Sequence, residues 1–130
     1  MAVKQLLAGK TALVTGAANR IGAQIARTLH QNGANLIIHH RPSTQNVIGN
    51  ASHTSSLNAK ALETEFNSLR PGSSIRYQAE LLNIIDIESL AQKSSQTFGQ
   101  LDILVNNASR FYSTPLGSIT EHNWTDLLSS

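Results

Sequence analysis

Two glycines, Gly16 and Gly22, stand where an apolar run of the sequence gives way to a helical pattern. A helix that starts at such a turn presents unpaired backbone N–H groups and the positive end of its dipole, which together favour an anion such as a phosphate. Gly16 would permit the sharp turn, and Gly22 would permit close approach of the helix to the sheet and to a ligand. The pair predicts a nucleotide-binding turn, although a purely structural turn would use the same residues.

The residues on either side of this turn predict a strand, a helix and a second strand. Thr11–Thr15 is apolar and rich in β-branched residues, and Ile21, Ile25 and Leu29 recur at helical spacing. Asn32-Gly33 is a typical helix end, and Asn35–His39 then reads as a second buried strand.

The same alternation continues along the chain. We expect a polar surface loop over 41–58 and then a helix whose buried side carries Leu62, Phe66 and Leu69. A third strand is expected at Ser74–Gln78. The next helix, capped by Asp86, should bury Ile87, Leu90, Ala91, Ser94 and Phe98 before a fourth strand at Leu101–Val105.

Strands that alternate with helices predict an α/β fold, a doubly wound parallel sheet of the Rossmann type. We expect residues 1–130 to form a single dinucleotide-binding domain. Ligands of such sheets gather beyond the carboxyl ends of the strands. The segments after Val14, Ile38, Gln78 and Val105 should therefore open into one crevice.

Composition excludes several other classes of protein. The chain has 10 Lys and Arg against 8 Asp and Glu, and its basic residues are scattered, so no nucleic-acid partner is expected. It contains no cysteine, which removes disulfides and thiolate metal sites. We find no apolar run that could span a membrane and expect a cytoplasmic protein.

The segment after the second predicted strand indicates which dinucleotide would bind. An NAD site usually has a carboxylate here for the ribose 2′-OH, but the sequence has no Asp or Glu between Gly33 and Glu63. His40, Arg41 and Ser43 instead offer donors for a 2′-phosphate, so NADPH is favoured. A solvated strand end is the alternative. A metal site from His39, His40 and His53 has poor ligand spacing, and no metal is expected.

The other two loops could complete a cofactor site. Glu80 and Leu81 follow the third strand and could lie near an adenine ring, although an exposed Glu is usually only solvated. Asn106–Ser109 follows the fourth strand with small and amide residues, which suits close approach to ribose and nicotinamide. Alone, it would be taken for a turn.

Thr15-Gly-x-x-x-x-Ile-Gly22 together with Asn106-Asn-Ala108 resembles the short-chain dehydrogenase/reductase family over nearly the whole chain. Its details are similar to the pteridine reductases: Arg20 where most members carry glycine, His39-His40-Arg41, and 107–116. The resemblance implies a tetrameric enzyme that uses NADPH to reduce dihydropterins or dihydrofolate, or other oxidised pterins. The cofactor contacts carried over by position are Gly16, Asn19, Arg20, Ile21, Gly22, His40, Arg41, Ser43, Glu80, Leu81, Asn107, Ala108 and Ser109.

The resemblance also implies three substrate contacts. Arg20 would touch both the cofactor phosphates and the pterin, Ser109 would line the nicotinamide pocket, and Phe111 would stack on the pterin ring. An aromatic face opposite the nicotinamide would sandwich a flat heteroaromatic and fix the hydride-transfer distance. Without the resemblance, a core aromatic and a solvated arginine would be the better interpretations of Phe111 and Arg20.

The proton donor of the family is not found in this sequence. Members use a tyrosine followed four residues later by a lysine, whereas Tyr77 and Tyr112 are followed at that distance by Leu81 and Leu116. We therefore expect no catalytic residue in this chain, and we expect the chain to be cut within a long helix. We also expect the fourth strand to expose an apolar edge that promotes aggregation. The alternatives are a reductase of another carbonyl substrate and a non-catalytic NADP-binding or assembly module.

Overall fold

The computed structural model describes residues 5–42, 51–109, 117, 120–122 and 125. The elements, in chain order, are β1 (Thr11–Val14), α1 (Arg20–Gln31), β2 (Asn35–His40), α2 (Ala51–Leu69), β3 (Ser74–Gln78), α3 (Ile84–Thr97) and β4 (Ile103–Val105). Each strand pairs in parallel with its neighbours. Strands alternate with helices as expected, and the predicted doubly wound fold is confirmed.

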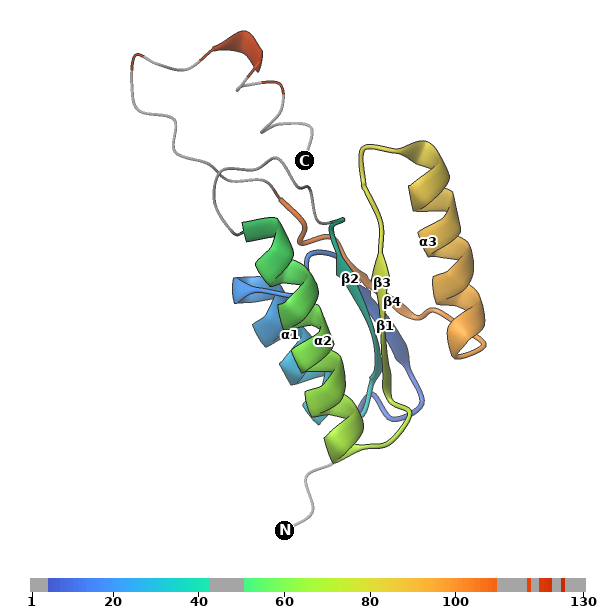
Figure 1. Ribbon diagram of the computed structural model, residues 1–130. Helices are drawn as coiled ribbons and strands as arrows, with labels where there is room; N and C mark the ends of the chain where they lie inside the picture. The colour runs from blue at the N-terminus through green and yellow to red at the C-terminus, as the bar shows by residue number, and fades with distance from the viewer. Residues whose placement is uncertain (1–4, 43–50, 110–116, 118–119, 123–124, 126–130) are drawn as a thin grey trace.

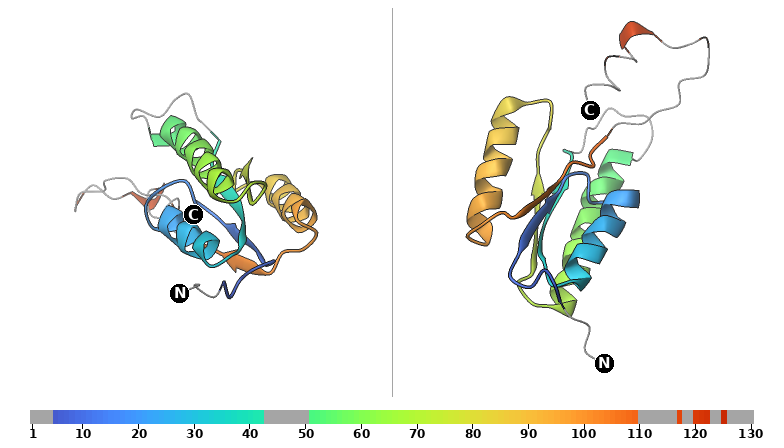
Figure 2. Two further views of the ribbon diagram at one scale, coloured as in Figure 1. Left: turned by 90° about the horizontal axis from the view of Figure 1, so that it is seen from below. Right: turned by 180° about the vertical axis from the view of Figure 1, so that it is seen from behind.

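The strand order in the sheet is β3-β2-β1-β4. Helices α1 and α2 cover one face of this sheet and α3 covers the other, as Figure 1 and the two views of Figure 2 show. The chain thus leaves β1 in one direction through α1 and α2, and returns through α3 to β4 on the other side of β1. A reversal of this kind opens a crevice beyond the carboxyl ends of the two strands.

The core lies on both faces of the central strand. Ala12 and Val14 pack toward α1 and α2, while Leu13 packs with Ile37 and with Leu90 of α3. Because successive strand residues point to opposite faces, a strand covered on both faces must be apolar throughout. This explains why β1 is largely apolar and why Leu36–Ile38 of β2 form a continuous apolar run.

The start of α2 corrects the expected loop. The surface loop was predicted over 41–58, but the helix already begins at Ala51. After Ala51, its first residues are mainly Ser, His and Thr, which have weak helix propensity and are typical of a loop. Burial of Ala59, Leu62 and Phe66 against the sheet provides tertiary packing that outweighs this local preference.

The N-terminal cap of α3 is also corrected. Asn83, not Asp86, precedes the helix, and its side-chain oxygen accepts the N–H groups of Ile85 at 2.9 Å and Asp86 at 3.3 Å. Asp86 lies in the first turn, where its carboxylate accepts the N–H of Glu80 at 2.8 Å. Both residues are good cap formers by type, and only the path of the chain after β3 decides between them.

The buried sides of α1, α2 and α3 each differ in part from the predicted stripes: in α2, Leu69 is 71% exposed. In α1, Ile25 and Leu29 pack against the core, but Ile21 is 69% exposed because the helix contacts the sheet through small residues. The buried residues of α1 are Gly22, Ala23, Ala26 and His30. In α3, Leu90 and Ser94 are buried, whereas Ile87 and Ala91 are exposed; Phe98, the residue after the helix, is half-buried.

The two edges of the sheet are treated differently. Side chains of α2 cover the outer edge of β3: Asn67 accepts the N–H of Ser74 at 3.0 Å, and Glu63 accepts the N–H of Arg76 at 2.8 Å. On the other edge, Leu104 of β4 is 56% exposed. Within the described residues, the predicted apolar edge at the fourth strand is therefore present, although β4 is shorter than expected.

No helix in the part of the chain that the structure describes combines the length and the apolar character needed to cross a bilayer.

A buried histidine connects α1 to the turn before β3. The His30 ring stacks on Phe66 with ring centroids 4.3 Å apart, and its Nε2 lies 2.7 Å from Ser73 Oγ. Ser73 in turn donates to the carbonyl oxygen of Phe66 at 3.2 Å, so the Nε2–H of His30 donates to Ser73. Burial, reinforced by the nearby charge of Arg70, lowers the pKa of His30 below its usual range.

This lowered pKa makes folding sensitive to acid. An unfolded chain takes up a proton at the ordinary histidine value of about 6.5, whereas native His30 resists protonation, so the stabilisation is complete above that pH and is lost below it. We expect the free energy of unfolding, measured by chemical denaturation, to fall from pH 7 to pH 5.5. His30→Gln, which keeps a donor to Ser73 without titrating, should reduce this pH dependence, and an unchanged slope would contradict the assignment.

Candidate functional site

The four loops after the strands meet at one edge of the sheet, as expected. The N–H of Ala17 donates to the carbonyl oxygen of His39 at 3.1 Å, which joins the first loop to β2. The N–H of Ala79 donates to His40 O at the same distance. Arg41 donates from its guanidinium to the carbonyl oxygen of Ser109, which joins the second loop to the fourth. The predicted convergence is confirmed for the described residues.

Thr15 and Asn107 join the first loop to the fourth. The Thr15 hydroxyl accepts the N–H groups of Asn107 and Ala108, each at 3.0 Å, and donates to Val105 O at 3.3 Å. The Asn107 side-chain amide donates to the carbonyl oxygens of Thr15 and Gly16, each at 3.2 Å. The polar groups at the ends of β1 and β4 are thus paired with one another.

Both glycines of the turn are required by this packing. Gly16 has φ +63, and a Cβ there would lie 2.9 Å from Ala108 Cα. A Cβ on Gly22 would overlap the carbonyl oxygen of Gly16 and the Asn107 amide nitrogen. Any larger residue at Gly22 would therefore push α1 away from the turn, as the sequence interpretation of these glycines anticipated.

The first turn of α1, which the structure describes in full, carries neither a side-chain cap nor an acidic residue. Asn19 precedes the helix in extended backbone, but its side chain makes no cap; it donates to Ser55 Oγ at 2.9 Å and accepts from Asn58 Nδ2. The backbone N–H groups of this turn and the helix dipole would therefore favour a negative ligand.

Arg20 occupies an unusual backbone conformation at this point. Its φ of +53 is the only positive value at a non-glycine residue in the described chain. Left-handed backbone costs an ordinary residue about 1–2 kcal/mol, which is the physical reason for a glycine to be usual at such a position. Arg20 and Ile21 are both exposed at the start of the helix.

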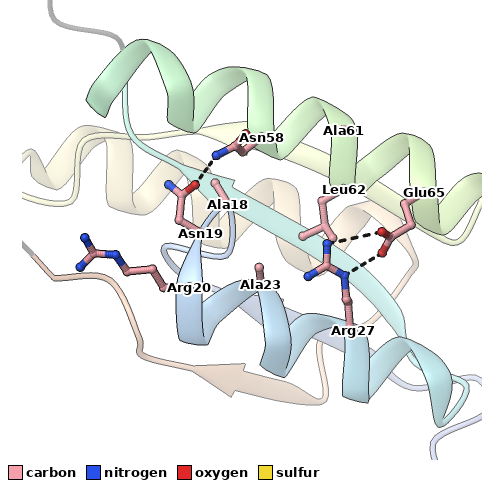
Figure 3. Close-up of a pocket in the computed structure, with 9 residues that line it drawn as sticks. All are labelled: Ala18, Asn19, Arg20, Ala23, Arg27, Asn58, Ala61, Leu62 and Glu65. Carbon is pink, nitrogen blue, oxygen red and sulfur yellow. Dashed lines mark hydrogen bonds and ion pairs between the residues drawn. The ribbon is translucent and has the colours of Figure 1, made fainter. Parts of the chain in front are cut away.

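A hollow of about 440 Å³ lies between α1 and α2. Figure 3 shows Asn19 facing Asn58 across it and Arg27 paired with Glu65 nearer the middle of the helices, while Arg20 extends away from this ion pair. The residues that line it are Ala18, Asn19, Arg20, Ala23, Arg27, Asn58, Ala61, Leu62 and Glu65. It shares Asn19 and Arg20 with the predicted site but, among the described residues, takes none from the other three loops.

The second and third loops place their predicted residues as follows. His40 is buried and its Nδ1 lies 3.0 Å from the Arg41 carbonyl oxygen. Glu80 is half-buried, and its Oε1 accepts the N–H of Leu82 at 3.2 Å. Leu81 packs against the apolar cluster on the α3 side. Ser43 and Phe111, which were also predicted to belong to the site, lie outside the described residues.

Sequence reasoning missed one residue of this site, His39. Its ring is fully buried, with Nδ1 accepting the N–H of Gly16 at 2.9 Å and Nε2 at 2.9 Å from Ala79 O. Burial lowers the pKa of His39. The available signal was the strand alternation, which puts His39 on the same inward face as Ile37 rather than at a solvated strand end.

Comparison with known proteins agrees with this geometry. The family model for short chain dehydrogenase matches residues 10–130. Pteridine reductase 1 of Leishmania tarentolae is 34% identical, over 81% of this chain and 38% of its own length. The Escherichia coli 3-oxoacyl-[acyl-carrier-protein] reductase FabG is 36% identical, over 92% of this chain and 42% of its own. The chain thus spans less than half the length of these relatives.

A solved structure is similar to the chain in both fold and sequence. A short chain dehydrogenase from Burkholderia cenocepacia, crystallised in complex with NADP, superposes with a TM-score of 0.77 and 31% identity, over 95% of this chain and 45% of its own. The sheet order, the glycine turn and the matched sequence lead to one conclusion: this chain belongs to the short-chain dehydrogenase family.

Proposed function

We propose that this chain supplies the cofactor-binding half of an NADPH-dependent reductase that transfers hydride to pterins, with dihydrobiopterin and dihydrofolate as the substrate class. The observation that carries the proposal is Arg41, which follows β2 and donates to the carbonyl oxygen of Ser109. A cation therefore stands where an NADH site would have a carboxylate, beside the loop expected to line the nicotinamide.

The charges around Arg41 support a 2′-phosphate as its ligand. The sequence has no Asp or Glu between Gly33 and Glu63, and a guanidinium can give a phosphate two parallel hydrogen bonds. The buried ring of His40 donates to the carbonyl oxygen of Arg41 and so helps to hold the backbone of Arg41 in place. Ser43 would add a hydroxyl by its position in the sequence. The NADP found in the Burkholderia structure is consistent with a nicotinamide cofactor.

The remaining cofactor contacts would come from the other three loops. Gly16, Asn19, Arg20, Ile21 and Gly22 would surround the phosphates, Glu80 and Leu81 the adenine, and Asn107, Ala108 and Ser109 the ribose and nicotinamide. The packed glycines and the uncapped first turn of α1 support the first group. The Thr15–Asn107 hydrogen bonds support the last, because they hold the fourth loop against the phosphate turn.

The proposed contacts of Arg20 and Phe111 favour pterins as the substrate class. A strained arginine in place of glycine costs stability, and strain of this kind is kept where it serves a site. We infer that the Arg20 guanidinium bridges a cofactor phosphate and the edge of the pterin ring. Phe111 would stack on that ring opposite the nicotinamide. The Leishmania pteridine reductase 1, at 34% identity, is a relative whose name agrees with this substrate class, but identity alone does not separate it from FabG, which is 36% identical.

NADPH, when bound, supplies the hydride, and the residues of this chain hold the two rings in place for it. A proton must also reach the reduced substrate. Tyr77 does not suit this task, because its hydroxyl is engaged with Thr97 Oγ1 at 2.7 Å between β3 and α3. Tyr112 has a leucine four residues later instead of a lysine. We infer that the proton donor lies outside these residues, in keeping with relatives more than twice as long.

The substrate class is tested with the complete protein. We expect NADPH oxidation, followed by the loss of absorbance of the reduced nicotinamide, to be faster with dihydrobiopterin or dihydrofolate than with simple ketones. Both pterin substrates should show saturation. Turnover of ketones or 3-oxoacyl thioesters without pterin turnover would indicate a different carbonyl reductase. Cofactor binding without turnover of any of them would indicate a binding module.

Arg41→Asp tests the choice of cofactor. A charge-assisted hydrogen bond contributes about 1.5–3 kcal/mol, so NADPH affinity should fall roughly 10- to 100-fold, while NADH affinity should change by a much smaller factor. Fluorescence titration with each cofactor measures both. Arg27→Asp is the charge-matched control, since Arg27 pairs with Glu65 on the helix surface. Equal losses for NADPH and NADH would refute the 2′-phosphate assignment.

Arg20→Gly separates the functional role of the arginine from its structural cost. Glycine relieves about 1–2 kcal/mol of left-handed strain but gives back about 0.5–1 kcal/mol in chain entropy, so stability should be equal or higher. Arg20→Ala retains the strain and should be less stable than Arg20→Gly. Both should raise the KM for dihydropterin, since both remove the guanidinium. An unchanged KM in both variants would remove Arg20 from the substrate site.

A further inference from the structure

We propose that His39 is a positioning residue for the phosphate-binding turn: its ring links Gly16 to the loop after β3, and dinucleotide affinity depends on that link. The inference rests on the proposed function, because the turn that His39 holds is the one at which the dinucleotide phosphates would bind. It concerns the part of the cofactor shared by NADPH and NADH, unlike the contact proposed for Arg41.

Three hydrogen bonds define the link. His39 Nδ1 accepts the N–H of Gly16 at 2.9 Å, and His39 Nε2 lies 2.9 Å from the carbonyl oxygen of Ala79. The backbone carbonyl of His39 accepts the N–H of Ala17 at 3.1 Å. One residue near the carboxyl end of an interior strand therefore holds two successive N–H groups of the turn on one side and the start of the third loop on the other.

The partners of the ring determine its chemical form. The Gly16 N–H can only donate, so Nδ1 must carry a lone pair, and the Ala79 carbonyl can only accept, so Nε2 must carry the hydrogen. His39 is thus a neutral imidazole with both nitrogens satisfied. A second proton would have to enter at Nδ1, where it would face the Gly16 N–H and break that bond.

The turn has little freedom to adapt if this bond is lost. Gly16 is already in a left-handed conformation, and the site of its missing Cβ lies 2.9 Å from Ala108 Cα, so the turn cannot move toward the fourth loop. On the other side, the ring of His39 occupies fully buried space. Without an acceptor, the Gly16 N–H would lose its partner at the point where the turn must be most closely defined.

The same arrangement gives the link a pH dependence. Burial lowers the pKa of His39, the charges of His40 and Arg41 lower it further, and the Ala79 carbonyl and Glu80 oppose them. From α3, Asp86 contacts the backbone of Glu80. The neutral ring is therefore retained at pH 7 and protonated only below the ordinary histidine value of about 6.5. Dinucleotide affinity should be constant above that pH and should fall below it.

Two substitutions separate the two ends of the ring. In His39→Asn the amide oxygen can take the place of Nδ1 and accept from Gly16, whereas in His39→Gln the longer amide reaches toward Ala79 and leaves Gly16 without an acceptor. The matched control is His30→Gln, which changes the other buried histidine with a lowered pKa. His30 bonds to Ser73 near the C-terminal end of α1, away from the cofactor turn.

The test measures Kd for NADPH and for NADH with the complete protein between pH 5 and 8. We expect His39→Gln to weaken both cofactors by the same factor, roughly tenfold, the effect of one buried hydrogen bond. His39→Asn should bind both cofactors within a few-fold of the wild type at pH 7.5, and its affinity should not fall at acidic pH. The NADH profile is decisive here, because NADH has no 2′-phosphate to titrate. His30→Gln should match the wild type.

An NMR titration of the Gly16 amide signal provides a readout that needs no cofactor. We expect this signal to shift with the protonation of His39 in the wild type and to stay constant in His39→Asn. The proposal would be overturned if His39→Asn and His39→Gln lost affinity equally and in proportion to their loss of melting temperature. His39 would then have a structural role only. A wild type that binds neither dinucleotide would overturn the proposed function as well. In that case the Gly16 signal, which needs no cofactor, would still show whether His39 and the turn are linked.

Discussion

The structure depends on how the polar backbone is satisfied where β1 and β4 part from each other. Beyond these strand ends the ladder of sheet hydrogen bonds stops, and unpaired buried N–H and C=O groups would be costly. The Thr15 hydroxyl accepts two N–H groups of the fourth loop, and the Asn107 side-chain amide donates to two carbonyl oxygens of the first loop. These bonds fix the glycine turn against the fourth loop and leave no room for a side chain at Gly22.

His39 completes this arrangement from the other side of β1. Its ring receives the N–H of Gly16 and reaches the third loop at Ala79, so the turn is held between β4 and β2. Side-chain groups thus replace the sheet ladder at the point where three strands diverge. A turn held in this way is pre-organised for a ligand, because little conformational entropy remains to be lost on binding.

The outward-facing cations differ in kind from this buried network. Arg20 has a left-handed backbone at the exposed start of α1, and Arg41 extends from the end of β2 to the fourth loop. Neither residue is required by the core, and Arg20 costs stability. Such features are expected where a protein recognises an anionic ligand, since a rigid, well-satisfied scaffold can tolerate local strain. The proposed NADPH and pterin contacts fall on these residues.

The sequence by itself determined the alternation of strands and helices, the glycine turn and the meeting of four loops, because these follow from local periodicity and from the geometry of parallel sheets. Only the tertiary structure decided that α2 starts at Ala51, that Asn83 caps α3, that Ile21 faces solvent and that His39 supports the turn. The physical reason is the distance along the sequence between interacting residues. Gly16 and His39, or Thr15 and Asn107, are partners far apart in the chain, and no local pattern records which buried donor meets which acceptor.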